Sequence, residues 1–207
     1  MPRSKGDHES HRREVSEAVW RVMSTGGFTG LSMRAVAGEL GSTTGLLTHY
    51  FASKRALVKY ALDLLEQRTA ARPRREAGGG LEGLRAALLD ILPLNADAVA
   101  GNRIWVSSWD SALADPQLCG DHARRYADGR GVLAARVAEA QDVGDLPPGD
   151  PDRIAASAQS FALGLVVQAL LDPAAFPPDH QTALLDDYLT ALARSPITSP
   201  GQPADGT

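Results

Sequence analysis

The chain has 207 residues, a formal net charge of −4 and one cysteine, Cys119. This length suits one large domain, or a small domain joined to a larger one, with a buried hydrophobic core. A single cysteine excludes an internal disulfide and a cysteine-rich zinc site. No apolar run reaches the roughly 20 residues that span a bilayer, and the polar N-terminus is unlike a signal peptide. We therefore expect a cytoplasmic protein with no membrane partner.

Charge is unevenly divided along the chain. Residues 1–60 contain 9 Lys or Arg against 5 Asp or Glu, a net +4, whereas residues 61–207 contain 12 against 20, a net −8. A basic region attracts nucleic acid and an acidic region repels it. The N-terminal region is therefore the predicted nucleic-acid-binding end.

The first predicted elements are a polar arm and a helix. Residues 1–11 are expected to form a disordered arm, and the alternative for its arginines is a contact in a DNA minor groove. The helix that follows ends before Gly26 and Gly27. Its buried face is predicted to consist of Val15, Ala18, Val19, Val22 and Met23.

Two short helices joined by a glycine turn come next. Ser32 is the expected N-cap of the first, Gly41 ends it, and Thr44 begins the second. This spacing is typical of a helix-turn-helix motif. The side predicted to face solvent, and to suit the DNA major groove, carries Thr43, Thr44, Leu46, Thr48 and His49.

Two further residues of this region favour contact with DNA. Gly45 costs the second helix about 1 kcal/mol relative to alanine, which indicates that another molecule approaches the backbone closely. Lys54 follows the predicted cap Ser53 at the start of a longer helix, where a cation opposes the helix dipole unless an anion is bound. A DNA phosphate would supply that anion.

The rest of the chain predicts further helices and no strand. The helix that Ser53 starts is expected to give way at residues 72–75 and the linker over residues 78–80, and Pro196 begins a disordered tail. The alternation typical of strands is absent, so the fold class is all-α with about nine helices. The remaining helices are predicted over residues 81–92, 97–113, 116–142, 151–171 and 179–193.

The predicted helix over residues 151–171 is apolar on more than one face. Such a helix must be covered on both sides. Together with the last helix it predicts a four-helix contact across a twofold axis, and hence a homodimer; packing within one chain is the alternative.

A ligand pocket is predicted from aromatic side chains in this larger region. Trp105, Ser108 and Trp109 share one helix face beside Asp110, and each indole attracts a cation by about 0.5 to 2 kcal/mol. The alternative is that both tryptophans belong to the core. Gln168 would need a partner if buried, and either a ligand or a neighbouring carbonyl would serve. The complete candidate set is Trp105, Ser108, Trp109, Tyr126, Phe161 and Gln168.

The two stretches VSEAVWRVMSTGGFTGLSMRAVAGEL and GSTTGLLTHYFASKRALV resemble the DNA-binding end of the TetR family of bacterial repressors. By position, the resemblance implies phosphate contacts from Thr43, Tyr50 and Lys54. It implies base contacts from Thr44, Gly45, Leu46 and His49, and support from Ser32 and Arg34. Two positions depart from the family's pattern: Ser42 replaces an apolar residue, and Thr48 replaces an aromatic phosphate contact.

The segment from Arg103 to Leu146 resembles the BetI-like branch of that family, whose founding member responds to choline. The resemblance implies a dimeric repressor that a small apolar or cationic effector releases from a palindromic operator on double-stranded DNA. The head is expected over residues 12–58, the ligand-binding and dimerisation body over 59–195, and the tail over 196–207.

Two alternatives remain for the function. One is an activator, or a nucleoid-type binder, with the same head. The other is a helical small-molecule-binding protein or enzyme with a vestigial head. The five histidines are dispersed, and no metal spacing, phosphate loop or nucleophile elbow is present. No cofactor, metal ion or catalytic residue is therefore predicted.

Overall fold

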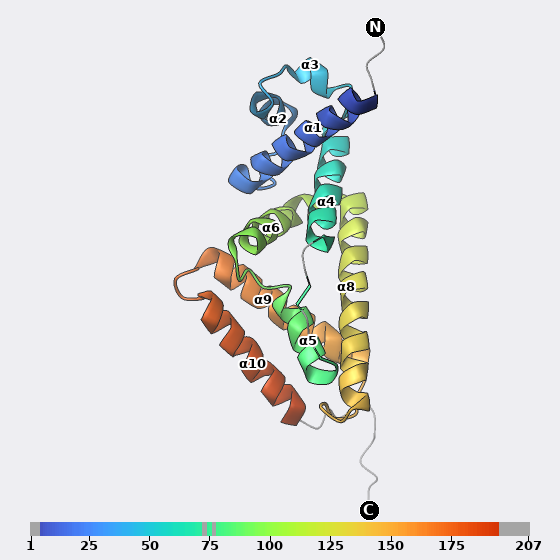
Figure 1. The fold of residues 1–207 in the computed structure, drawn as a ribbon, viewed down its shortest axis with the longest axis vertical. Coiled ribbons are helices and arrows are strands. Elements are labelled where there is room, and N and C mark those ends of the chain that lie inside the picture. The colour runs from blue at the N-terminus through green and yellow to red at the C-terminus, as the bar shows by residue number, and fades with distance from the viewer. Residues whose placement is uncertain (1–4, 72–73, 76–77, 195–207) are drawn as a thin grey trace, which may run out of the picture. The chain divides into compact units, whose positions relative to one another are not determined.

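The computed structural model describes residues 5–71, 74–75 and 78–194, and all of its regular elements are helices (Figure 1). The absence of strands within these ranges agrees with the predicted all-α class. The described part of the chain contains ten helices: α1 (Lys5–Gly26), α2 (Met33–Glu39), α3 (Thr44–Leu47), α4 (Lys54–Ala70), α5 (Gly80–Leu89), α6 (Ala96–Ser107), α7 (Trp109–Ala114), α8 (Pro116–Asp142), α9 (Pro151–Leu171) and α10 (Pro178–Arg194).

Two helices differ from the sequence-based expectation. Helix α1 includes residues 5–11, which the sequence predicts as a disordered arm, because helix propagation adds one hydrogen bond for each further residue. The single helix predicted over 97–113 is divided at Ser108. There the Ser107 and Ser108 hydroxyls donate to the carbonyls of Ile104 and Trp105, three residues back, which competes with regular helix geometry. The predicted tail over 196–207 lies outside the described residues.

The chain forms two compact units. The head unit comprises residues 1–72 together with 100–119, and the body unit comprises residues 73–99 together with 120–207. The head unit therefore contains α1 to α4 and also most of α6, all of α7 and the first turn of α8. This grouping differs from the predicted division at residue 58.

In the head unit, α1 packs against α2 and α4, and α2 packs against α3. Predicted core residues such as Val19 and Met23 are fully buried, and Ile104 of α6 and Leu118 of α8 complete the same cluster. Burying each such side chain contributes about 1.5 to 3 kcal/mol. The core of the head therefore joins side chains of α1 to side chains that follow them by about 80 to 100 residues in the sequence.

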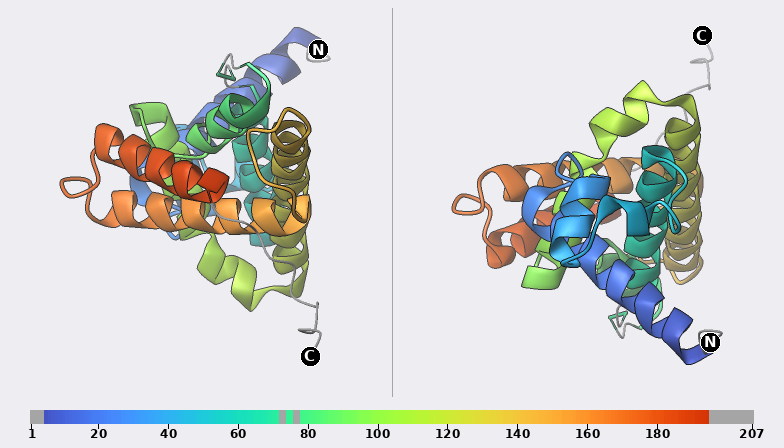
Figure 2. Two further views of the ribbon diagram at one scale, coloured as in Figure 1. Left: turned by 90° about the horizontal axis from the view of Figure 1, so that it is seen from below. Right: turned by 90° about the horizontal axis from the view of Figure 1, so that it is seen from above.

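In the body unit, α10 lies beside α9 and also packs on α5 (Figure 2). Arg85 of α5 donates two hydrogen bonds to Asp186 of α10, at 2.6 and 2.9 Å. That hydrogen-bonded carboxylate raises the pKa of the Arg85 guanidinium above its usual value. Phe161 of α9 stacks on Tyr188 of α10, with ring centroids 4.4 Å apart. These contacts hold the last helix against the unit.

Candidate nucleic-acid interface

The α2–α3 region has the predicted helix-turn-helix geometry. Ser32 caps α2, since its hydroxyl accepts from the Ala35 N–H at 3.1 Å. Gly41 has a φ of +61°, the left-handed conformation that a helix-ending glycine adopts without strain. The Ser42 N–H donates to the Ala37 carbonyl at 2.9 Å and closes the turn. The backbone then enters α3 at Thr44, as the sequence predicts.

The residues predicted to contact DNA lie on the accessible side of this motif. Leu47 is fully buried, which fixes the inward side of the short helix α3. Half-buried positions are Ser32, Leu46 and Tyr50. Exposed positions are Arg34, Thr43, Thr44, Gly45, Thr48, His49 and Lys54. The accessible side of α3 therefore presents short hydroxyl groups, an apolar side chain and an imidazole.

Hydrogen bonds within the motif distinguish its threonines. Thr43 is at the N-cap of α3 but makes no side-chain capping bond there. Thr48 donates its hydroxyl to the Gly45 carbonyl at 2.7 Å. A DNA backbone phosphate has no proton to donate and can only accept, so Thr48 would have to break this internal bond to donate to one. Thr48 is consequently a poorer phosphate donor than its exposure suggests.

The packing of the protein does not require a glycine at position 45. A Cβ atom added there would meet only the Thr43 hydroxyl oxygen, at 3.7 Å, which is ordinary contact. The packing of the protein therefore leaves room for a side chain that the sequence does not use. The close approach of another molecule to the α3 backbone therefore stays a prediction for this position.

The start of α4 completes the candidate interface. The Ser53 hydroxyl accepts from the Ala56 N–H at 3.1 Å and caps the helix, as predicted. Lys54, the first residue of α4, is exposed. Its neighbour Arg55 is instead paired with Asp115 at 3.5 Å and with the side chain of Gln117. Lys54 thus stands at a capped helix N-terminus, where a phosphate binds favourably.

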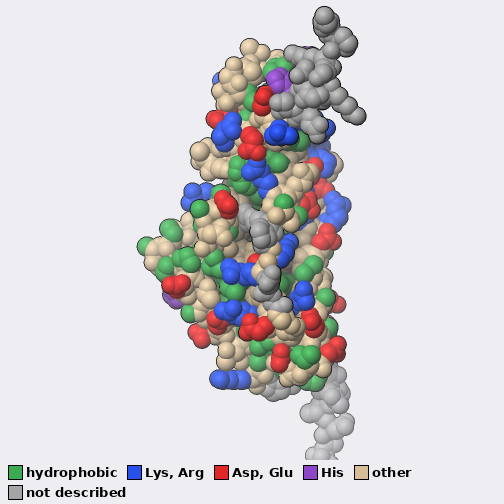
Figure 3. Space-filling model, viewed as in Figure 1, with side chains coloured by type: hydrophobic (Ala, Val, Ile, Leu, Met, Phe, Trp, Pro, Cys, Tyr) green, Lys and Arg blue, Asp and Glu red, His purple; other side chains and the backbone are tan. Residues whose placement is uncertain are grey.

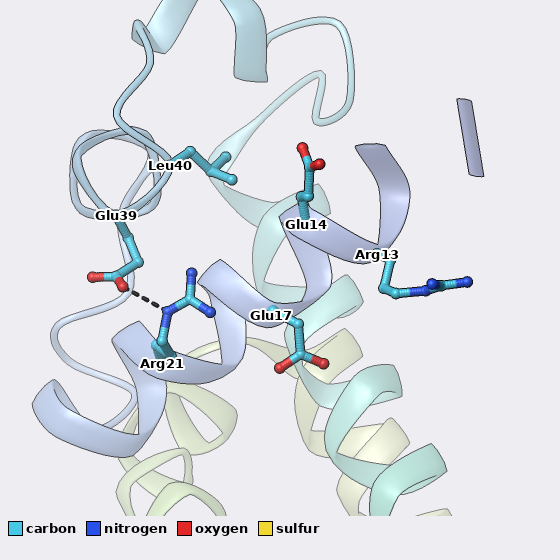
Figure 4. A pocket seen from close by; sticks show the side chains of 6 residues that line it. All are labelled: Arg13, Glu14, Glu17, Arg21, Glu39 and Leu40. Carbon is cyan, nitrogen blue, oxygen red and sulfur yellow. Dashed lines mark hydrogen bonds and ion pairs between the residues drawn. The ribbon is translucent and has the colours of Figure 1, made fainter. Parts of the chain in front are cut away.

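A depression of about 390 Å³ opens elsewhere on the head unit, between α1 and α2 (Figure 4). Arg21 and Glu39 form an ion pair across it at 2.6 Å, while Arg13 points away from that pair. Its lining contains none of the predicted DNA or ligand contacts: Arg13, Glu14, Glu17, Arg21, Glu39 and Leu40. Mixed charge of this kind suits helix-to-helix ion pairing. On the face shown in Figure 3, basic and acidic side chains are likewise interspersed.

The predicted ligand residues are divided between the two units. Trp105, Ser108 and Trp109 belong to the head unit, and Tyr126, Phe161 and Gln168 belong to the body unit. Trp105 packs against the head core, which supports the core alternative for that indole. Among the described residues no group of three or more His, Cys, Asp or Glu side chains is placed to hold a metal ion. The ligand pocket itself stays a prediction.

The glutamines of α9 show what the sequence-based reasoning missed. Gln168 is exposed on the protomer, so it does not need a buried partner. Gln159 is the buried glutamine, 8% exposed, and its side-chain amide donates to the Tyr126 carbonyl at 3.3 Å. The sequence does place Gln159 on the same helix face as Ala155 and Ala162 and next to Ala158, and the structure buries all three alanines completely. That spacing was the signal that could have identified Gln159.

Comparison with known proteins identifies the family. Residues 16–61 match the profile of bacterial regulatory proteins of the tetR family, and residues 80–194 match that of the BetI-type transcriptional repressor C-terminal domain. The chain belongs to the TetR family. It is a transcriptional regulator with a helix-turn-helix head and a larger helical body.

Full-length relatives of this TetR-family chain are themselves regulators. The HTH-type transcriptional regulator PksA of Bacillus subtilis is 28% identical over 192 residues, covering 90% of this chain and 91% of that protein. The regulator BetI of Serratia proteamaculans is 24% identical over 191 residues, covering 88% and 92%. No relative named here is an enzyme.

Solved structures show the same fold. A transcriptional regulator from Rhodococcus sp. Rha1 has a TM-score of 0.77 at 24% identity, covering 91% of this chain and 98% of its own. A regulator from Saccharomonospora viridis, crystallised in complex with choline, has a TM-score of 0.78 at 22% identity, with coverage of 88% and 96%.

Proposed function

We propose that this TetR-family regulator is a cytoplasmic, homodimeric repressor that binds a palindromic operator and is released by a small apolar or cationic molecule. The accessible side of α3, beside the capped start of α4, is the observation that carries the DNA-binding role. Short hydroxyls, an apolar contact and a terminal lysine suit base edges, thymine methyl groups and phosphates respectively.

The dimer is supported by α9. This helix is apolar enough to cross a membrane by length and composition, yet only 44% of its most apolar window is buried within the chain. A second copy of the chain would cover the remainder. A palindrome whose half-sites lie one turn apart requires two recognition helices about 34 to 36 Å apart, and a twofold dimer would supply the second helix.

Release of the repressor from DNA requires an effector that binds more tightly to the state in which the two recognition helices are too far apart to contact both half-sites. A ligand with equal affinity for both states would shift nothing. The choline complex of the Saccharomonospora viridis regulator supports a cationic ligand such as a quaternary amine, for which Trp109 would be the predicted aromatic contact. The activator, with the same head, would differ only in the direction of the transcriptional response.

A footprint on DNA flanking the gene, repeated across a salt series, tests the proposal. We expect a protected palindrome that outlasts non-specific binding as salt rises. Thr44→Ala should remove the protection, whereas Thr69→Ala, a threonine of α4 whose hydroxyl bonds the Leu65 carbonyl, should keep it. Choline chloride is the first effector to add. Diffuse, salt-sensitive coating of all DNA by the wild-type protein would contradict specific operator binding.

A further inference from the structure

One hydrogen bond joins α6 to the turn between α1 and α2. The Ser107 hydroxyl accepts from the Phe28 N–H at 2.8 Å and donates to the Ile104 carbonyl at 2.9 Å. The two bonded residues are 79 positions apart in sequence. The bond from Phe28 attaches this turn to the end of α6, and the bond to Ile104 fixes the Ser107 hydroxyl on its own helix.

The turn that receives this bond has little conformational freedom. Gly27 has a φ of +62°, and an added Cβ would lie 3.3 Å from the Ser107 hydroxyl oxygen. Phe28, the next residue, is only 4% exposed and belongs to the head core. The Leu31 N–H then donates to the Phe28 carbonyl at 3.2 Å, directly before the Ser32 cap of α2. The position of Phe28 thus sets where α2 begins.

Helix α2 in turn positions the DNA-contacting residues. It supplies the predicted contacts Ser32 and Arg34, and α3 packs against it. A shift of the α1–α2 turn would therefore displace the predicted DNA-contacting surface, although the turn itself supplies none of the predicted contacts. Interfaces tolerate little such displacement, since a hydrogen bond weakens steeply once its geometry departs from the optimum.

We propose that Ser107 is a positioning residue for operator binding: its hydroxyl holds the α1–α2 turn, and through it the recognition surface, in the DNA-binding arrangement. Ser107 is the last residue of α6 and belongs to the head unit together with Phe28, so the bond lies within one compact unit. This inference rests on the proposed operator binding.

The test compares Ser107→Ala with Ser107→Thr in the full-length protein. Threonine keeps a hydroxyl that readily bonds the carbonyl three or four residues back in a helix, so it should retain wild-type behaviour. Alanine leaves the Phe28 N–H without its partner and should weaken operator affinity about tenfold. Affinities are compared at a temperature at which circular dichroism shows all variants fully helical.

Hydrogen–deuterium exchange adds a readout that needs no DNA. In Ser107→Ala, the peptide that contains Phe28 should exchange about tenfold faster, and in Ser107→Thr at the wild-type rate. Ser24→Ala is the matched control, because the Ser24 hydroxyl donates only to the Trp20 carbonyl of its own helix, at 2.8 Å. It should change neither readout.

The outcomes separate this inference from the proposed function. Operator affinity and Phe28 exchange that stay at wild-type values in Ser107→Ala would overturn it, as would a Ser107→Thr protein as weak as Ser107→Ala. A wild-type protein that protects no operator would overturn the proposed function, and the positioning role with it.

Discussion

At the scale of single residues, Ser42 is unfavourable for the stability of the DNA-binding head. Its hydroxyl oxygen is buried and has no hydrogen-bond partner among the described residues. Leaving such a group unpaired costs about 1 to 3 kcal/mol. The position lies in the turn between α2 and α3, where the family resemblance implies an apolar side chain. The chain therefore keeps a polar group there at a cost in stability.

Replacing Ser42 with alanine should stabilise the protein. We expect Ser42→Ala to raise the free energy of unfolding by about 1 kcal/mol, because it removes an unsatisfied buried oxygen. Denaturant unfolding followed by circular dichroism measures this. Ser53→Ala is the control of opposite sign, since it removes the α4 cap and should cost about 1 kcal/mol. A loss of stability in Ser42→Ala would mean that the hydroxyl has a partner.

At the scale of elements, the start of α5 depends on glycine. Gly80 has a φ of +67°, and an added Cβ would lie 2.2 Å from a carboxylate oxygen of Asp145. That same carboxylate accepts from the Leu81 N–H at 2.9 Å, so it is held where it is. The segment predicted from sequence as a simple linker therefore ends in a close contact with the loop after α8.

Gly80→Ala should destabilise the protein by about 1 to 2 kcal/mol or more, because it adds backbone strain to a steric clash. The shift of the denaturation midpoint measures the effect. Gly120→Ala is the matched control: this glycine lies inside α8, and an added Cβ would meet nothing within 4 Å. The control should gain about 0.5 to 1 kcal/mol. Equal effects at the two positions would contradict the role given to Asp145.

At the scale of the whole molecule, the outer side of α9 offers the surface for the proposed dimer. Over the second half of this helix the exposed positions recur at nearly helical spacing: Ser160, Gly164, Gln168 and Leu171. Leu171, which is 81% exposed, places a large apolar side chain at the end of this stripe, where a partner helix would cover it. Small residues in the stripe allow a second helix to approach closely.

Gly164→Arg should convert the dimer to a monomer. An added Cβ at Gly164 would meet nothing within 4 Å, so one protomer accepts the substitution, whereas a partner helix packed there would not. Sedimentation velocity measures the oligomeric state, and operator affinity should fall at least tenfold because one head cannot bind both half-sites. Gly120→Arg, exposed on α8, should remain dimeric. A dimeric Gly164→Arg protein would place the interface elsewhere.

The sequence alone determined the features whose causes are local. The caps Ser32 and Ser53 and the turn at Gly41 were predictable, because each involves a hydrogen bond or a backbone angle within a few residues. The helix-turn-helix motif and its accessible side followed from the same local spacing. Family membership also followed from this segment, since its residue pattern is distinctive.

Only the tertiary structure decided which distant segments share a core. The packing of residues 100–119 with the head, the bond from Ser107 to Phe28 and the burial of Gln159 rather than Gln168 all depend on the angles at which helices cross. Those angles result from the interlocking of many side chains from different helices, and no short window of sequence contains them. An amphipathic pattern indicates that a helix face is covered, whereas the tertiary fold decides which helix covers it.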